Sequence, residues 1–359
     1  MERLKIFYVM PELGSHTHFS YNFDFISYIR SFLKDELEIG VLVEKSGGVI
    51  ADFLPFRLVK NFIRLFRARL SGYGNFYIHY SFLSAFNASL IVKLLGGRVF
   101  YWNAGLPWLY KRNFLRGWFE KIVYRLIDYL VTGTEGLRNE YAKFYKLNAY
   151  KIKVLPNWIN LEETNKLIAS ADKQSLKNKL NIREEKVLLF VHRLSKRKGA
   201  HRLPEILKGL KEEKIVLVIA GDGPERINIE KKFENLGTAP KVRFLGNVPH
   251  ENILNYFAIA DVFLMPSEEE GFPHALLEAM AAGVPFVATK VGGVAEITPP
   301  AASAYLVNQG DMENFIKSVR LLLHLDESEK EKLRRSLRHW AGRYDLKLVA
   351  EKFKNLFLN

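Results

Sequence analysis

The chain has 359 residues, 48% of them hydrophobic, and this length suits two domains of about 150–200 residues each. It contains no cysteine, which excludes thiolate catalysis, disulfides and cysteine-ligated zinc. The net charge is +14, and residues 1–157 carry 22 basic but only 12 acidic side chains. This concentration predicts that something anionic faces the amino-terminal half.

The chain begins like a Rossmann unit. Residues 4–10 read as a buried strand, Gly14 and Ser15 follow in a turn, and 21–35 have helical character. This start lacks the apolar core and cleavage site of a signal peptide. No apolar run reaches the roughly 18 residues of a membrane span, so we expect no transmembrane helix. Three further strands are predicted at 39–43, 76–80 and 98–102.

Two segments of the first half are both basic and aromatic, residues 51–72 and 108–129. In the first, apolar side chains recur at helical spacing and arginines or lysines fill the remaining positions. Such a pattern is typical of a helix that lies on an anionic membrane surface. It is equally typical of a Rossmann helix that packs on its sheet and shows a cationic face to water. Both interpretations stay open.

The second half repeats the strand and helix pattern. A strand at 186–191 leads to Arg193 and Lys198, which precede a helix. A strand over 214–220 ends at Asp222 between two glycines, a residue pattern that favours a turn over a metal site. The next strand runs into Gly246, Asn247 and Val248.

The most informative stretch is 267–289, SEEEGFPHALLEAMAAGVPFVAT. A strand-like run at 262–265 precedes it, so the pattern is strand, acidic turn, helix and strand. In an open α/β sheet, ligands bind where strands end, and a helix start suits a phosphate. Glu270 stands in the turn and Glu278 about one helical turn into the helix. Carboxylates accept hydrogen bonds in pairs and therefore fit the vicinal hydroxyls of a ribose or a sugar ring.

This stretch resembles the motif of the family 4 retaining glycosyltransferases (glycosyl transferases group 1). The resemblance is tightest over about residues 150–300. It implies an α/β protein of the GT-B class, with two facing Rossmann-like domains and a deep cleft between them. The expected parts are an acceptor-side domain at 1–160, a nucleotide-sugar domain at 161–338 and a terminal helix at 339–359 that crosses back to the first domain.

The resemblance also implies an activity, a retaining and metal-independent transfer of a hexose-type sugar from a nucleotide-diphosphate sugar such as a UDP- or GDP-hexose. No cofactor is implied beyond this co-substrate. Glu270 would hold sugar hydroxyls, Glu278 the ribose, and Arg193 and Lys198 the leaving diphosphate. The remaining donor contacts would come from Gly271, Phe272, His274 and Ala275 and, beside the base, from Gly246, Asn247 and Val248.

At several positions the chain departs from the family pattern. Asn103 stands where many members have a histidine, and His192 stands where glycine is common. The glycine-rich turn of the acceptor side is reduced to Gly14 and Ser15. An asparagine cannot carry charge near neutral pH, so Asn103 would orient a sugar hydroxyl without acting as a proton shuttle.

The expected partners are the nucleotide sugar, a glycan or lipid-linked acceptor and an anionic membrane surface, with a peripheral location at the cytoplasmic face. Two other classes of function stay open. One is another GT-B enzyme, a nucleotide-sugar epimerase or a glycan phosphorylase. The other is a basic nucleic-acid-binding protein, which the acidic run at 268–270 disfavours.

Overall fold

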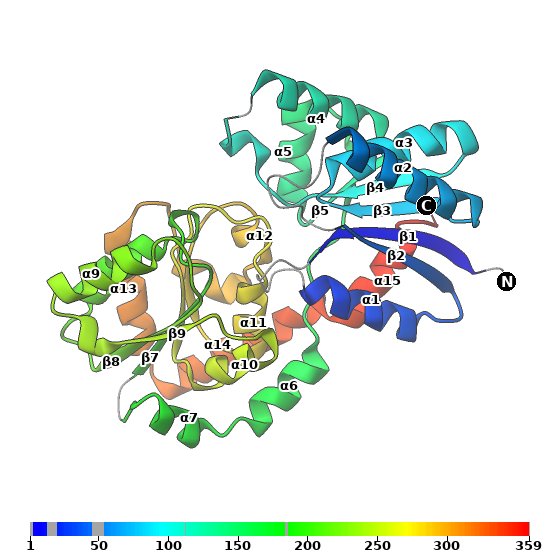
Figure 1. The fold of residues 1–359 in the computed structure, drawn as a ribbon. Coiled ribbons are helices and arrows are strands. Elements are labelled where there is room, and N and C mark those ends of the chain that lie inside the picture. Colours follow the sequence, from blue (N-terminus) through cyan, green and yellow to red (C-terminus); the bar gives the residue numbers. More distant parts are fainter. Residues whose placement is uncertain (1–2, 13–19, 45–53, 112, 184–185, 359) are drawn as a thin grey trace. The chain divides into compact units, whose positions relative to one another are not determined.

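The computed structural model describes residues 3–12, 20–44, 54–111, 113–183 and 186–358. The chain divides into two compact units. Unit 1 comprises Met1–Pro156 with Val349–Asn359, and unit 2 comprises Asn157–Leu348. Figure 1 shows α/β architecture in each, and the expectation of two Rossmann-like domains is confirmed. Among the described residues, no helix combines the length and the apolar character needed to cross a membrane.

Unit 1 contains a six-stranded sheet of order β2-β1-β3-β4-β5-β6, and every named pair in it is parallel. The strands that were expected at 4–10, 39–43, 76–80 and 98–102 are all present. Parallel strands need crossover connections, and the helices between them supply these. The strands are β1 (Leu4–Pro11), β2 (Leu37–Glu44), β3 (Asn75–His79), β4 (Arg98–Trp102), β5 (Tyr129–Thr132) and β6 (Ile152–Val154).

Some helices of unit 1 begin at a residue whose side chain caps the first turn. Thr134, for example, accepts a hydrogen bond from the backbone N–H of Leu137 at 3.1 Å. The helices are α1 (Ser20–Phe32), α2 (Leu54–Leu70), α3 (Phe82–Leu95), α4 (Phe114–Leu126) and α5 (Glu135–Tyr145), with short 3-10 turns η2 (Pro107–Leu109) and η3 (Ala149–Lys151).

The end of the chain packs on the sheet of unit 1. Phe353 of α15 (Leu346–Asn355) lies 4.9 Å from Tyr77 and 5.5 Å from Phe25, measured between ring centroids. Figure 1 shows α15, in red, alongside β1 and α1. Trp340 instead donates a hydrogen bond at 2.9 Å to the Ile297 carbonyl of unit 2. The segment grouped with unit 1 therefore begins at Val349, later than the start expected at residue 339.

Unit 2 contains a second six-stranded parallel sheet of order β12-β11-β10-β7-β8-β9. All six residues of β8 are buried, as expected for a strand covered by helices on both faces. The strands are β7 (Lys186–Val191), β8 (Ile215–Ala220), β9 (Val242–Gly246), β10 (Val262–Met265), β11 (Phe286–Thr289) and β12 (Leu306–Val307).

The helices of unit 2 connect these strands. The chain enters through α6 (Leu161–Ser170) and α7 (Lys173–Lys179), and it leaves through α13 (Met312–Leu323), α14 (Glu327–Ala341) and η8 (Gly342–Tyr344). Between them lie η4 (Lys196–Lys198), η5 (Ala200–Arg202), α8 (Leu203–Gly209), α9 (Arg226–Asn235), η6 (Ala239–Lys241), α10 (His250–Ile259), α11 (His274–Ala282), α12 (Val294–Ile297) and η7 (Pro300–Tyr305).

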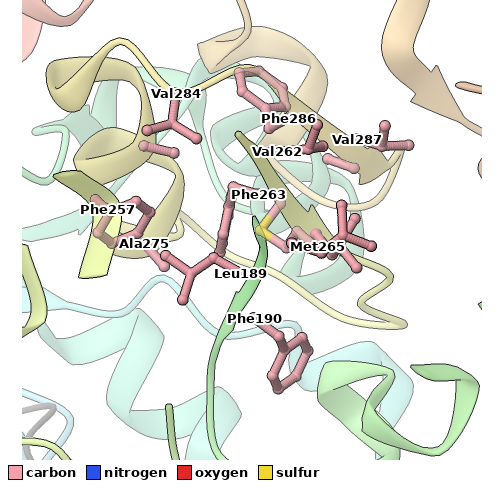
Figure 2. Packing of buried hydrophobic residues seen from close by; sticks show 14 of the residues in the cluster. Leu189, Phe190, Phe257, Val262, Phe263, Met265, Ala275, Val284, Phe286 and Val287 are labelled. Carbon is pink, nitrogen blue, oxygen red and sulfur yellow. The ribbon is translucent and has the colours of Figure 1, made fainter. Parts of the chain in front are cut away.

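The core of unit 2 fixes the central strand β10. Phe263 pairs in register with Leu189 of β7, and its ring lies 5.4 Å from the ring of Phe257 on α10. Figure 2 shows Phe263 among these side chains, with Ala275 of α11 nearby. All four residues of β10 are buried, so the loop that follows Met265 leaves from a rigid support.

Candidate active site

The loop after β10 carries a buried carboxylate, Glu270, whose side chain is 3% exposed. Its Oε2 accepts a hydrogen bond from the Lys198 ammonium at 2.7 Å, and its Oε1 accepts one from the Ser267 hydroxyl at 2.7 Å. The Nε2 atom of His192 lies 3.5 Å from Oε1. Two residues expected in the site, Glu270 and Lys198, are therefore in direct contact.

The surroundings of Glu270 keep it ionised. Burial by itself raises the pKa of a carboxyl, because the charged form loses its water. At Glu270 the charges of Lys198 and His192 and the hydrogen bonds from Lys198 and Ser267 together outweigh burial, so the pKa is lowered. A buried carboxylate with this support is a hydrogen-bond acceptor of fixed orientation, which suits the hydroxyl groups of a sugar.

The whole acidic run 268–270 faces one basic segment, residues 196–202. Besides the Lys198–Glu270 pair, Arg202 donates to Glu268 at 3.1 Å, and an Arg197 guanidinium nitrogen lies 3.8 Å from Glu269. The backbone N–H of Glu268 also donates to the Arg197 carbonyl at 2.9 Å. Ion pairs between side chains and a backbone hydrogen bond thus connect the loop after β7 to the loop after β10.

Close backbone approaches hold the loops around Glu270. Gly292 has a φ of +51°, and a Cβ added there would lie 1.6 Å from the Glu270 carbonyl oxygen. Gly199 has a φ of +68°, and a Cβ there would lie 1.9 Å from the Pro266 carbonyl oxygen. Any side chain at either position would displace the loop that carries Glu270, because these oxygens belong to the backbone.

Glu278 lies in α11, four residues after the helix begins, and is 2% exposed. The Nδ1 atom of His250 on α10 lies 3.6 Å from its Oε1. The helix start at His274 and Ala275 follows Pro273, and a helix start presents backbone N–H groups and a partial positive charge. Glu270 and Glu278 therefore stand before and after a helix start, as the sequence predicted.

A residue far away in the sequence holds this helix start. Asn157 is buried, and its Nδ2 donates to the Phe272 carbonyl at 2.7 Å and lies 3.2 Å from Nδ1 of His274. The ring of Trp158 lies 5.8 Å from the His274 ring in a perpendicular arrangement. The Asn157-Trp158 pair thus positions both Phe272 and His274.

The other expected residues of unit 2 lie on neighbouring loops of the sheet. Arg193 follows β7 and is exposed to solvent. Gly246 ends β9 with a φ of +68°, and its carbonyl accepts a 2.7 Å hydrogen bond from the N–H of Gly221. Asn247 is exposed and Val248 half-buried. Gly271 accepts a hydrogen bond at 3.2 Å from the N–H of Gly293, which ties it to the loop after β11.

The expected residues of the first half belong to unit 1. Gly14 and Ser15 lie outside the described residues. Asn103 follows β4 and is buried, and its amide is held at both ends. Its Nδ2 donates to the Tyr124 hydroxyl at 3.1 Å, and its Oδ1 accepts from the Gly105 N–H at 2.9 Å. Asn103 thus shapes its own loop, and contact with a sugar stays a prediction.

Sequence reasoning missed the supporting residues of the site. In the sequence, Ser267 looks like an ordinary loop serine, and His250 lies in a helix that carries no motif. Only the fold brings Asn157 to Phe272, across 115 positions. The available signal was a polar side chain two residues after a buried strand, which describes Ser267 but also many ordinary loop residues. Within the described ranges, no group of three or more His, Cys, Asp or Glu side chains is arranged to hold a metal ion.

Comparison with known proteins finds similarity to glycosyltransferases. Residues 172–340 match the family model described as glycosyl transferases group 1. The sulfoquinovosyl transferase SQD2 of Arabidopsis thaliana is 32% identical over 175 residues, which cover 48% of this chain and 33% of SQD2. The chain spans between about a third and a half of the length of the curated relatives that it matches.

Solved structures match over nearly the whole chain. A glycosyltransferase from Rickettsia africae aligns with a TM-score of 0.84 at 17% identity, covering 99% of this chain and 98% of that one. Anabaena Alr3699/HepE, solved in complex with UDP, aligns with a TM-score of 0.79 at 16% identity over 98% and 99% of the two chains. Identities this low establish a common fold, which is GT-B. Residues 172–340, which lie in unit 2, are similar to the glycosyl transferases group 1.

Proposed function

We propose that the chain is a retaining glycosyltransferase, which moves a hexose-type sugar from a nucleotide-diphosphate sugar to a glycan or lipid-linked acceptor. The observation that carries the proposal is the buried Glu270 carboxylate, held by Lys198 and Ser267 and followed within four residues by the start of α11. This arrangement places an acceptor for sugar hydroxyls close to backbone donors for a diphosphate.

In this proposal, a carboxylate of the protein binds each end of the donor. Glu278 accepts hydrogen bonds from the ribose hydroxyls, and Glu270 accepts them from the transferred sugar. The backbone N–H groups of Phe272, His274 and Ala275 meet the phosphates or the sugar, whereas Pro273 has no N–H to offer. Gly246, Asn247 and Val248 lie beside the nucleotide base and read it through backbone groups.

Arg193 and Lys198 neutralise the departing diphosphate. Negative charge grows on the leaving group as the glycosidic bond breaks, so two cations aimed at it stabilise the transition state more than the ground state. Lys198 is already buried and oriented by Glu270, whereas Arg193 is exposed and free to swing onto a phosphate. These cations and the helix start supply the positive charge, and the proposed transfer therefore requires no metal ion.

Retention of configuration follows from a front-face displacement. The bond between the anomeric carbon and the diphosphate oxygen breaks, and the acceptor hydroxyl attacks from the same face. The leaving phosphate oxygen takes the proton of that hydroxyl, so no protein nucleophile is consumed. In this scheme Glu270 positions the sugar and makes no covalent bond to it.

The proposed acceptor lies at an anionic membrane surface, with the protein peripheral at the cytoplasmic face. Support comes from α4 and the turn before it, where Phe114 is 84%, Leu115 73% and Trp118 58% exposed. Lys111, Arg116 and Lys121 are also exposed within this segment. Apolar side chains enter the lipid boundary, and each basic residue near an anionic leaflet adds about 1 kcal/mol of attraction.

A calorimetric titration with UDP, GDP, ADP and their common sugars tests the donor part of the proposal. UDP comes first, since Alr3699/HepE was solved in complex with UDP. We expect one nucleotide to bind and Glu278→Ala to lose about 1–3 kcal/mol of its binding free energy, as for an unpaired buried polar group. Glu251→Ala, which removes an exposed carboxylate of α10, is the matched control. Equal affinities for wild type and Glu278→Ala would remove Glu278 from the site.

A further inference from the structure

A basic cavity lies in unit 1 at the amino ends of its strands. Its volume is about 590 Å³. Arg98 and Tyr129 are the first residues of β4 and β5, and Lys151 directly precedes β6. β4 has five residues, so this end of the sheet lies about 16 Å from the end at which Asn103 follows the strand. The cavity is therefore separate from the sheet edge that carries Asn103.

The lining of the cavity has an excess of positive charge. Arg98, Arg125, Lys151 and Lys153 line it, and Asp128 is the acidic residue among the lining side chains. Asp128 accepts a 2.7 Å hydrogen bond from the Val99 N–H, so the backbone already engages its carboxylate. Within the described part of the chain, no ion pair joins any of the four cations to a carboxylate.

Three of the four cations, Arg98, Lys151 and Lys153, contact neutral groups. Lys151 donates to the Arg125 carbonyl at 2.8 Å, and Arg98 donates to the Asn75 amide oxygen at 3.2 Å and to the Phe357 carbonyl. The Lys153 ammonium lies 5.1 Å from the centre of the Tyr129 ring. These contacts orient the three side chains without cancelling their charge, so their attraction for an anion stays in place.

Burial adds to this attraction at Lys151. Burial lowers the pKa of the Lys151 ammonium, the nearby Asp128 charge raises it, and the Lys93 charge lowers it again. The net effect is a lowered pKa, because the loss of water around the ammonium outweighs the attraction of Asp128. An anion bound in the cavity would stabilise the charged form.

We propose that this cavity is a binding site for a phosphate-bearing ligand, distinct from the donor site of unit 2. Arginine and lysine are the side chains that recognise phosphate groups, through charge-assisted hydrogen bonds. One water molecule takes about 30 Å³ of liquid volume. The cavity, at about 590 Å³, has room for about twenty such volumes and therefore for a group larger than a single phosphate. The cavity accommodates a diphosphate or a phosphate with a ring attached. Tyr150, 86% exposed on the lining, offers an aromatic face to such a ring.

Hydrogen exchange on the full chain tests the proposal, with inorganic pyrophosphate as the soluble probe. We expect pyrophosphate to slow amide exchange within residues 148–153. The double variant Arg125→Gln and Lys153→Gln should weaken this protection at least tenfold in apparent affinity. Exchange within residues 266–280 serves as an internal reference, because pyrophosphate also resembles the donor's diphosphate.

A matched control removes the same charge elsewhere in unit 1. Lys34 and Lys143 are exposed and do not line the cavity, so Lys34→Gln with Lys143→Gln should leave the protection unchanged. Vesicles that contain phosphatidic acid form the second arm. Protection by these vesicles but not by pyrophosphate, lost in the Arg125 and Lys153 variant, would assign the site to a lipid phosphate. No protection from either probe, or equal protection in both double variants, would overturn the proposal.

Discussion

Lys198 and Glu270, 72 positions apart in the sequence, form a buried ion pair with 2.7 Å between Nζ and Oε2. Both were expected in the site, one for the diphosphate and the other for the sugar. Their contact means that neither charge is left uncompensated before the donor binds. A buried charge without a partner is costly, and in this pair each group compensates and orients the other.

Replacing Glu270 by Gln should abolish sugar transfer while nucleotide binding survives. The amide keeps the shape but loses the charge that holds Lys198 and orients the sugar. We expect the transfer rate to fall by at least about 100-fold, equal to about 2.7 kcal/mol of transition-state stabilisation. The UDP affinity should stay within about threefold, since Glu278 holds the ribose.

This prediction is checked by product formation and calorimetry on the same preparations. Glu269→Gln is the control, because the neighbouring Glu269 faces Arg197 instead of Lys198. Near-normal transfer by the Glu270 variant would remove Glu270 from the mechanism.

Gly292→Ala should disturb the site through its backbone. The methyl group would meet the Glu270 carbonyl, and the φ of +51° adds strain. Gly310→Ala is the matched control, because Gly310 also has a positive φ, +87°, but no atom within 4 Å of an added Cβ. We expect the control to cost about 1–2 kcal/mol of unfolding free energy from strain alone.

The Gly292 variant should cost more than the control and also weaken donor binding. Urea denaturation and UDP titration of both variants measure the two effects. Equal losses in the two variants would mean that the loop relaxes away from residue 292 without moving Glu270.

His79 should make unit 1 sensitive to mild acid. His79 is buried at the end of β3, and its Nε2 forms a hydrogen bond with the Tyr8 hydroxyl at 2.7 Å. Its ring stacks on the ring of Trp102, with 4.5 Å between the centroids. Burial lowers the pKa of His79 to about 3. The unfolded chain therefore binds a proton below about pH 6.5 that the folded chain does not bind.

The direction of the change in stability with pH follows from this difference in bound protons. The contribution of His79 to stability is complete above pH 6.5 and is lost as the pH falls toward 3, at up to about 1.4 kcal/mol per pH unit. His79→Gln keeps a hydrogen-bonding partner for Tyr8 but cannot titrate. Urea denaturation between about pH 6.5 and 5, above the range of most carboxyls, should show a smaller loss of stability in the variant. Parallel pH profiles would contradict the prediction.

The exposed apolar side chains of α4 should control vesicle binding. Replacing Phe114, Leu115 and Trp118 by Ser removes the groups proposed to enter the lipid boundary. Because burying each such side chain is worth about 1.5–3 kcal/mol, we expect binding to anionic vesicles to fall at least tenfold. Co-sedimentation with anionic and neutral vesicles measures this.

A control for surface hydrophobicity comes from unit 2. Ile227 is 65% and Leu321 54% exposed, and serine at both positions should leave vesicle binding unchanged. Equal binding of the wild type to neutral and anionic vesicles would argue against the anionic surface, whatever the variants do.

The sequence by itself determined the elements and the order of the site motifs. The run predicted as a strand at 262–265 is β10, and the helix predicted over HALLEAMAA is α11. Strands buried on both faces and capped helices leave local patterns in residue type, so both could be read without the fold. The eight-residue spacing of Glu270 and Glu278 was also readable from the sequence, because both residues lie within one turn and the helix that follows it.

Only the tertiary structure decided which side chains meet. The pairing of Lys198 with Glu270 joins residues 72 positions apart, and the hydrogen bond from Asn157 to Phe272 joins residues 115 positions apart. The basic cavity also depends on the fold, because its lining residues come from separate segments between Arg98 and Lys153. The hydrogen bond from the Asn103 amide to the Tyr124 hydroxyl belongs to the same class. Local residue patterns do not encode such contacts, because they depend on strand order and on how closely the loops approach at the ends of a parallel sheet.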